Sequence, residues 1–245
     1  MSKLVLLKNN DFLSPINREY RVLEFRFSDF SETDKEKVIQ EAEELAISAH
    51  SNSANSGENR SAIVKQNDAY AGILAEYVTL YFLNSLNNSF AYRPEVHDTK
   101  NQIDISWSLN GQNYSVEVRS SFVKNGLNFG LFGYNASAQQ PYFDILGPYF
   151  QSNYKSEYES VKNVYARVLF ERNKFNVKER FIKDDEPFYL IGFMPGDTIV
   201  KLDYHKPLTP GSAVTKEGSL TGSYYVAPIN MITDVGKMME YYGRL

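Results

Sequence analysis

Cysteine is absent from the 245-residue sequence, and histidine occurs only three times. The absence of cysteine excludes disulfide bonds, thiolate zinc sites and cysteine nucleophiles. His50, His97 and His205 are scattered along the chain without the spacing of a metal site. The sequence also has no Gly-x-Ser-x-Gly motif for a serine nucleophile. A hard metal ion held by carboxylate oxygens is the metal chemistry that a pattern in this sequence still supports.

Long apolar runs are missing as well. No run approaches the length that spans a membrane, and Met1–Asn10 lacks the profile of a signal peptide. We therefore expect a cytoplasmic protein without a membrane partner. The chain length and a hydrophobic fraction of 42% fit one sizeable domain with a substantial core.

Positive charge is not in excess. The net charge of −4 and the pI near 5.5 argue against a protein that coats nucleic acid non-specifically, because such binding uses many phosphate contacts. One local basic groove is still compatible with these values. The locally positive stretch 155–183 could grip phosphates, although a charge-rich helix is more often a solvated face. Its basic residues are Lys155, Lys162, Arg167, Arg172, Lys174, Lys178, Arg180 and Lys183.

The segment from Gln102 to Arg119 is predicted to form a β-hairpin. Two runs of alternating apolar and polar residues flank Asn110-Gly111, which is the strongest short-range signal for a two-residue type I′ turn. Counting outward from this turn, the register pairs Leu109 with Gln112, Trp107 with Tyr114, Ile105 with Val116, and Asp104 with Glu117. The aromatic and aliphatic residues then share one face of the hairpin, and the two acids share the other with Arg119.

Two opposed acids are the chemical signal of this hairpin. Directly opposed like charges destabilise a β-ladder by up to about 1 kcal/mol. The repulsion between Asp104 and Glu117 must therefore be relaxed by solvent, shared with Arg119, or removed by a bound cation. An ordinary solvated face with no ligand is the alternative interpretation of the same residues.

A second signal lies upstream, in the predicted helix Asn67–Leu86. This helix is apolar almost all round, so we expect it to be buried. Glu76 is its only charged residue after the first turn. An unpaired buried carboxylate is costly, so Glu76 needs either a metal or a basic partner, for which Arg93 and Arg119 are the candidates.

A glutamate on a buried helix, then Asp104 on one strand, then Glu117-Val118-Arg119 on the next resembles the PD-(D/E)XK phosphodiesterase superfamily, the fold of many restriction endonucleases. In that family an acid-x-Lys motif lies on the third strand, an aspartate begins the strand before it, and a glutamate often lies on the preceding helix. The resemblance covers roughly residues 67–124. It implies an α/β fold with a mixed sheet flanked by helices and a site for Mg²⁺, which Mn²⁺ can replace. It also implies that Asp104, Glu117 and the backbone carbonyl of Val118 bind the metal, that Arg119 takes the lysine position, and that Glu76 supports the metal shell through water.

The chain departs from the family pattern at two positions. Ile103 stands where the motif has proline, and Arg119 stands in place of the lysine. A guanidinium is effectively always charged, so Arg119 can hold a phosphate or a water but cannot take a proton. In an active enzyme the proton must leave through a metal-bound water or to the substrate, or Lys124 or Lys100 must reach the site from elsewhere.

The segment Val123–Asp144 is predicted to be a long irregular loop beside the cleft. It mixes glycine, aromatic and amide side chains, which can stack on bases and pair with their edges, although ordinary loop packing accounts for the same composition. Our candidate DNA contacts, from this loop and the basic stretch, are Lys124, Asn125, Asn128, Lys155 and Lys162.

The remaining patterns complete a single α/β domain. Residues 1–60, with a strand, an acidic helix and a polar loop, are expected to decorate a nuclease-like core of residues 61–245. Further strands are expected at Tyr20–Phe27, Phe188–Met194, Thr198–Leu202 and Ser223–Pro228, further helices at Ser31–His50, Tyr154–Arg172 and Thr233–Tyr242, and loops at Ser51–Ser61 and His205–Gly222.

The function implied by the resemblance is a metal-dependent DNA endonuclease of the restriction type. Its expected partners are double-stranded DNA, a second copy of the chain if it cuts both strands of a symmetric site, and a cognate DNA methyltransferase encoded nearby. Two alternatives stay open. One is a non-catalytic DNA-binding protein with the same fold, and the other is a protein–protein interaction domain, which the acidic pI favours.

Overall fold

A mixed β-sheet forms the centre of the protein, and its strand order is β1-β2-β10-β9-β5-β4-β3, with β13 paired to β10. The computed structural model describes residues 2–9, 14–49, 60–94, 103–151, 160–172, 174–207 and 223–243. The strands of this sheet are β1 (Lys3–Leu7), β2 (Tyr20–Phe25), β3 (Ser89–Tyr92), β4 (Ile105–Leu109), β5 (Gln112–Val123), β9 (Val164–Glu171), β10 (Phe188–Pro195) and β13 (Thr233–Asp234). Strands β5 and β9 run parallel, whereas the other described pairs of this sheet are antiparallel. The expected α/β class with a mixed sheet flanked by helices is confirmed.

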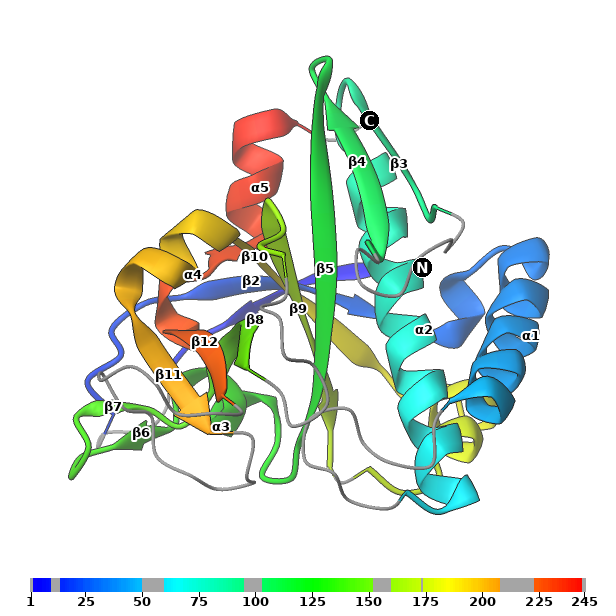
Figure 1. Ribbon diagram of the computed structural model, residues 1–245, viewed down its shortest axis with the longest axis horizontal. Coiled ribbons are helices and arrows are strands. Elements are labelled where there is room, and N and C mark those ends of the chain that lie inside the picture. Colours follow the sequence, from blue (N-terminus) through cyan, green and yellow to red (C-terminus); the bar gives the residue numbers. More distant parts are fainter. Residues whose placement is uncertain are drawn as a thin grey trace.

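Two long helices cover one face of this sheet. Helix α2 (Ala62–Asn84) packs on β3, β4, β5 and β10, and α1 (Glu32–Ser48) packs on the outside of α2 (Figure 1). The core on this face is formed by apolar side chains of α2 together with alternate residues of the strands, such as Val116, Val168 and Leu190. Alternation along each strand sends the intervening residues to the opposite face.

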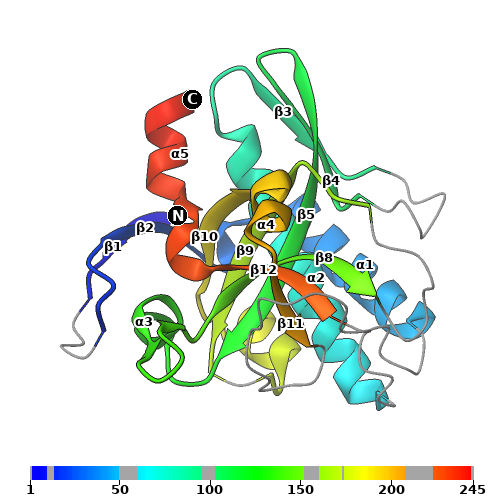
Figure 2. The ribbon, with the colours of Figure 1, turned by 60° about the vertical axis from the view of Figure 1, so that its left-hand side comes forward.

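A small antiparallel sheet covers that opposite face. Its order is β11-β12-β8, with β8 at Asp144–Gln151, β11 at Tyr204–Pro207 and β12 at Ser223–Pro228. Helices α3 (Leu127–Phe132) and α4 (Gly196–Leu202) pack beside it, and Figure 2 shows β8 and β12 in front of β9 and β5. A second apolar cluster, which includes Tyr165, Leu169 and Ile199, fills this layer. Helix α5 (Val235–Tyr242) packs on β2 and β10.

The predicted hairpin is confirmed in its turn and in its register from Leu109–Gln112 to Ile105–Val116, whereas the expected pair Asp104–Glu117 is not formed because Asp104 lies in a bend before β4. Asn110 and Gly111 have positive φ angles of 49° and 80°, as a type I′ turn requires. The pairs Trp107–Tyr114 and Ile105–Val116 form as counted from the sequence. The apolar face of the hairpin packs into the core under α2, so the alternation predicted the buried face correctly.

The long helices are confirmed, with a corrected start for one of them. Helix α1 begins after Ser31, whose hydroxyl accepts from the Asp34 N–H. Helix α2 begins at Ala62 and not at Asn67, because the Ser61 hydroxyl caps it by accepting from the Val64 N–H. Helix α5 begins after the Asp234 cap.

Two secondary-structure predictions are wrong. The expected helix Tyr154–Arg172 is instead strand β9 from Val164 to Glu171; the residues before it, 152–159, lie outside the described part. Both faces of β9 are buried, so its sequence does not alternate between apolar and polar residues as a half-exposed strand does. The spacing of its apolar residues therefore resembles that of a helix. The expected strand Thr198–Leu202 is helix α4, and β10 pairs instead with β2, β9 and β13.

The expected loops contain short elements. The segment 123–144 holds α3 and a two-stranded ribbon, β6 (Tyr134–Asn135) with β7 (Gln140–Pro141). Strand β11 occupies the start of the expected loop His205–Gly222, and residues 208–222 lie outside the described part. The predicted loop Ser51–Ser61 lies almost wholly outside it too.

The N-terminal strand is an integral part of the sheet. Strand β2 pairs with β1 on one side and with β10 on the other, so residues 20–25 share the main core and do not merely decorate its edge. Within the described residues, no helix combines the length and the apolar character needed to cross a membrane.

Candidate functional site

Asp104 contacts strand β5 at the open end of the β4–β5 ladder, at the residue that follows Glu117. The ladder ends at the pair Ile105–Val116, and Asp104 lies in a bend directly before β4. Its Oδ2 accepts a hydrogen bond of 2.8 Å from the backbone N–H of Val118. The Asp104 carboxylate therefore replaces the backbone carbonyl that a longer β4 would offer, and this bond holds it against the Val118 backbone.

The backbone of Val118 contributes a third oxygen at this point. The N–H and C=O of one residue in an antiparallel ladder point to the same neighbouring strand. Because the Val118 N–H points to Asp104, its carbonyl faces the same side, beyond the end of the β4 ladder. Two carboxylates and a carbonyl, completed by water, are hard oxygen ligands of the kind that Mg²⁺ uses. Within the part of the chain that the structure describes, no group of three or more acidic or histidine side chains is arranged around a metal position.

Arg119 lies beside Glu117 on the same face of β5. Their charged groups are 3.3 Å apart between Nη1 and Oε1, and only 14% and 11% of the two side chains are exposed. The repulsion between Asp104 and Glu117 was expected to be relaxed by solvent, by Arg119 or by a bound cation. This ion pair corresponds to the second of these. Arg119 also lies 3.5 Å from the Gly147 carbonyl and places its guanidinium carbon 5.8 Å from the centre of the Tyr224 ring.

Glu76 has the basic partner that was the alternative to a metal. Its Oε2 accepts from Nε of Arg93 at 2.8 Å and lies 2.6 Å from Nη2 of the same residue. Arg93 also pairs with Glu41 of α1, and the Tyr77 hydroxyl donates to Glu41 at 2.7 Å. The Glu76 side chain is therefore part of a network that joins both long helices to the end of β3.

Electrostatics connect Glu76 to the hairpin acids. Burial, and then the negative charges of Asp104 and Glu117, raise the pKa of Glu76 well above its ordinary value. Burial lowers the pKa of Arg93, and the charge of Asp104 opposes that change. The three carboxylates therefore influence one another across the end of the hairpin, and a positive ion there would reduce their repulsion.

The predicted DNA contacts do not gather at the acids. Lys124 and Asn125 are exposed in the turn after β5, and Asn128 is exposed on α3. Five residues of strand separate Lys124 from Arg119, roughly 17 Å at about 3.3 Å per residue. Lys162 is only 3% exposed, and its ammonium donates to the Ser160 hydroxyl at 2.9 Å, so it presents little charge at the surface. Lys155 lies outside the described residues.

Sequence reasoning missed that Arg167 lies next to Arg119 and that Asp144 lies close to Arg167. Arg167 was counted on an expected solvated helix, but it lies in β9, where the parallel register pairs it with Arg119. Asp144 at the start of β8 is paired with Lys206 of β11, with 2.6 Å between Oδ2 and Nζ. Only the pairing of β5 with β9 brings Arg119 and Arg167 together, and no local pattern predicts that pairing.

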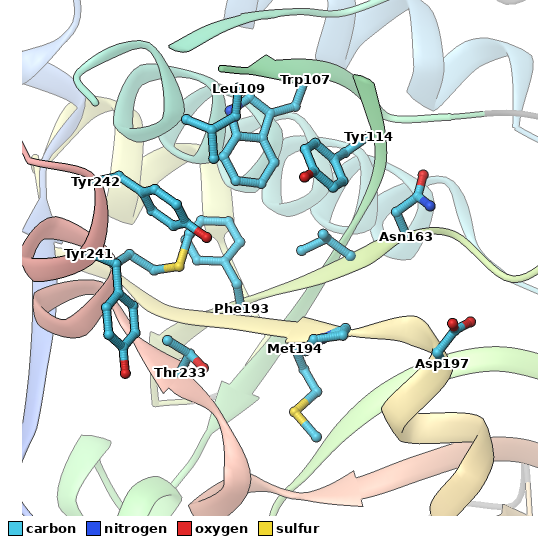
Figure 3. Close-up of a pocket in the computed structure, with 13 residues that line it drawn as sticks. Trp107, Leu109, Tyr114, Asn163, Phe193, Met194, Asp197, Thr233, Tyr241 and Tyr242 are labelled. Carbon is cyan, nitrogen blue, oxygen red and sulfur yellow. The ribbon is translucent and has the colours of Figure 1, made fainter. Parts of the chain in front are cut away.

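A cavity of about 340 Å³ lies at the other end of the hairpin (Figure 3). Aromatic side chains dominate its walls, among them Trp107, Tyr114, Phe193 and Tyr242. Asp104, Glu117 and Arg119 do not line it. The cavity is therefore a gap in the apolar packing between the hairpin and α5, separate from the acidic site.

Comparison with known proteins found no matching family model, no matching curated protein and no matching solved structure.

Proposed function

We propose that the protein is a metal-dependent DNA endonuclease of the restriction type, with a restriction endonuclease-like core. The observation that carries the proposal is the 2.8 Å hydrogen bond from the Val118 N–H to Asp104, because it fixes the Asp104 carboxylate against β5 at the residue between Glu117 and Arg119. The order of the elements supports it. Helix α2 bears Glu76. Asp104 directly precedes strand β4, and the next strand, β5, bears Glu117 and Arg119.

In this proposal Asp104, Glu117 and the Val118 carbonyl hold Mg²⁺, or Mn²⁺ in its place. When bound, the metal supplies a Lewis acid and a water of lowered pKa for phosphodiester hydrolysis. Arg119 binds negative charge on the phosphate, and because it stays protonated it takes no proton. Glu76, held by Arg93, orients water at the edge of the site.

The proposed substrate is double-stranded DNA in the cytoplasm. If it cuts both strands of a symmetric site, we expect it to act as a two-fold homodimer, and a cognate methyltransferase encoded nearby would protect the host DNA.

The test is a cleavage assay with Mg²⁺ or Mn²⁺ on unmethylated, methylated and otherwise modified DNA. Discrete fragments that disappear with EDTA and in Glu117→Ala are the expected result. Intact DNA under every condition, from a folded protein that binds the same DNA, would overturn the catalytic proposal.

One observation favours a second candidate, a non-catalytic DNA-binding protein. The ion pair of Arg119 with Glu117, at 3.3 Å, already supplies a positive counter-charge where the metal would lie. DNA binding that is unchanged by EDTA, without cleavage, would support this candidate.

A further inference from the structure

Arg167 is a charged residue buried in the middle of the main sheet. Only 2% of it is exposed. It shares a strand face with Tyr165 and Leu169, which is the face that the small sheet covers. The register of the parallel pair β5–β9 places Arg119 directly beside it on the neighbouring strand, about 4.8 Å away in backbone spacing. Two guanidinium groups therefore lie next to each other on one face.

The guanidinium of Arg167 has no partner among the described residues. Its Nε and Nη1 are buried and donate no hydrogen bond, and Arg167 forms no ion pair within that part of the chain. Burial, and to a lesser degree the positive charge of Arg119, lowers the pKa of Arg167 to about 10, while Asp144 acts in the opposite direction. Arg167 therefore stays charged at neutral pH. A buried charge without hydrogen bonds is unfavourable, so Arg167 lowers the free energy of unfolding in the absence of a ligand.

The nearby carboxylates are already engaged. Asp144 binds Lys206 at 2.6 Å, and Glu117 binds Arg119 at 3.3 Å. The positive charge of Arg167 is thus left without a contacting negative charge in the described structure. An anion with several oxygen acceptors would satisfy it.

We propose that Arg119 and Arg167 form a phosphate-binding pair that holds a backbone phosphate of the nucleic acid beside the Asp104–Glu117 carboxylates. A phosphate suits this pair because its tetrahedrally arranged oxygens can accept from two guanidinium groups at once. Arg119, the more exposed of the two, is where the phosphate enters, and Arg167 binds it from behind. The identity of this anion as a nucleic-acid phosphate rests on the proposed function, whereas the existence of the anion site rests on Arg167 alone.

The test compares Arg167→Gln with Arg172→Gln. Arg172 directly follows β9, and its side chain is 75% exposed, so the control removes the same charge from the same region without touching the buried face. Melting temperatures are measured in EDTA with and without inorganic phosphate, at constant ionic strength. Affinity for a short DNA duplex is measured in EDTA over a range of salt concentrations.

Phosphate is expected to raise the melting temperature of the wild type and of Arg172→Gln, because it binds the native state only. Arg167→Gln should melt at the wild-type temperature or above it without phosphate, and phosphate should not change that temperature. Its DNA affinity should fall roughly tenfold or more, as expected for lost charge-assisted hydrogen bonds. The slope of log affinity against log salt should decrease by about one.

Wild-type responses to phosphate and to DNA in Arg167→Gln would overturn the inference. Loss of the phosphate response while DNA affinity is unaffected in Arg167→Gln would keep the anion site but overturn its assignment to the nucleic-acid backbone. If Arg167→Gln does not fold, Arg167→Lys keeps the charge but loses the planar fork, and it should show a weakened response in both assays. All of these measurements are made without a divalent metal, so a failure of cleavage leaves their outcome intact.

Discussion

Arg93, which follows β3, forms an ion pair with Glu76 of α2, with 2.6 Å between Nη2 and Oε2. The pair holds a carboxylate whose pKa is nevertheless raised, because burial and the charges of Asp104 and Glu117 disfavour its ionised form. Two opposing influences therefore act on one side chain. The balance between them determines how the stability of the protein depends on pH.

Glu76→Gln tests this balance. A carboxyl with a raised pKa stabilises the native state fully below its unfolded pKa, and that stability is lost as the pH rises through the native pKa. Glutamine resembles the protonated acid at every pH. In metal-free buffer, we expect the melting temperature of Glu76→Gln relative to the wild type to increase as the pH rises above the ordinary glutamate value. Thermal melts from acidic to neutral pH measure this difference.

The control for this experiment is Glu240→Gln. Glu240 forms an exposed ion pair with Arg21, and exposed pairs contribute about 0–1 kcal/mol. The melting temperature of Glu240→Gln should stay close to that of the wild type across the pH range. If Glu76→Gln is instead less stable than the wild type at neutral pH, the Arg93 pair outweighs burial and holds the carboxylate ionised.

Local patterns predicted the hairpin well, because its determinants are close in sequence. Asn110 and Gly111 supply the positive φ angles of the turn, and alternation assigns the buried face. Strand β9 was mistaken for a helix because its neighbours are distant in sequence. It is buried on both faces, and a charged Arg167 interrupts its apolar run.

The candidate site likewise contains residues that local sequence patterns predicted and one, Arg167, that they did not. Counting from the turn placed Asp104 close to the Glu117–Arg119 segment, although the ladder ends one pair earlier, at Ile105–Val116. The scarcity of charge on α2 identified Glu76 and the need for a partner such as Arg93. The adjacency of Arg119 and Arg167 depends on the parallel pairing of β5 with β9. That pairing is decided by packing of the whole sheet, so the sequence placed Arg167 on a solvated surface.

Substitutions at the two hairpin acids separate structure from chemistry. Asp104→Asn retains an oxygen that can accept from the Val118 N–H, whereas Asp104→Ala leaves that N–H without this acceptor. We expect Asp104→Ala to be less stable than Asp104→Asn by about 1 kcal/mol in urea unfolding. Both variants and Glu117→Ala should lose cleavage while DNA binding persists in gel-shift assays. Cleavage by any of them would remove that residue from the proposed metal site.

Arg119→Lys tests which role the guanidinium has. If Arg119 occupies the lysine position of the family, the variant should keep or increase its cleavage rate, because an ammonium can also hold the phosphate or a water. The ion pair with Glu117 should persist, so the melting temperature should change little. Complete loss of cleavage with an intact fold would indicate bidentate phosphate recognition, which only the planar fork provides.

Two glycine substitutions test whether the turn positions the site. Gly111 has a φ of 80°, so Gly111→Ala forces a side chain into the left-handed region, at a cost of about 1 kcal/mol in unfolding free energy. Gly72 lies on α2, one turn before Glu76, and a Cβ there would meet nothing within 4 Å. Gly72→Ala should therefore stabilise the protein by about 0.5–1 kcal/mol. Because the turn sets the register that brings Asp104 to the Val118 N–H, Gly111→Ala should also lower the cleavage rate, and Gly72→Ala should not. Equal cleavage by both variants, despite opposite changes in urea midpoints, would show that the register survives without the glycine.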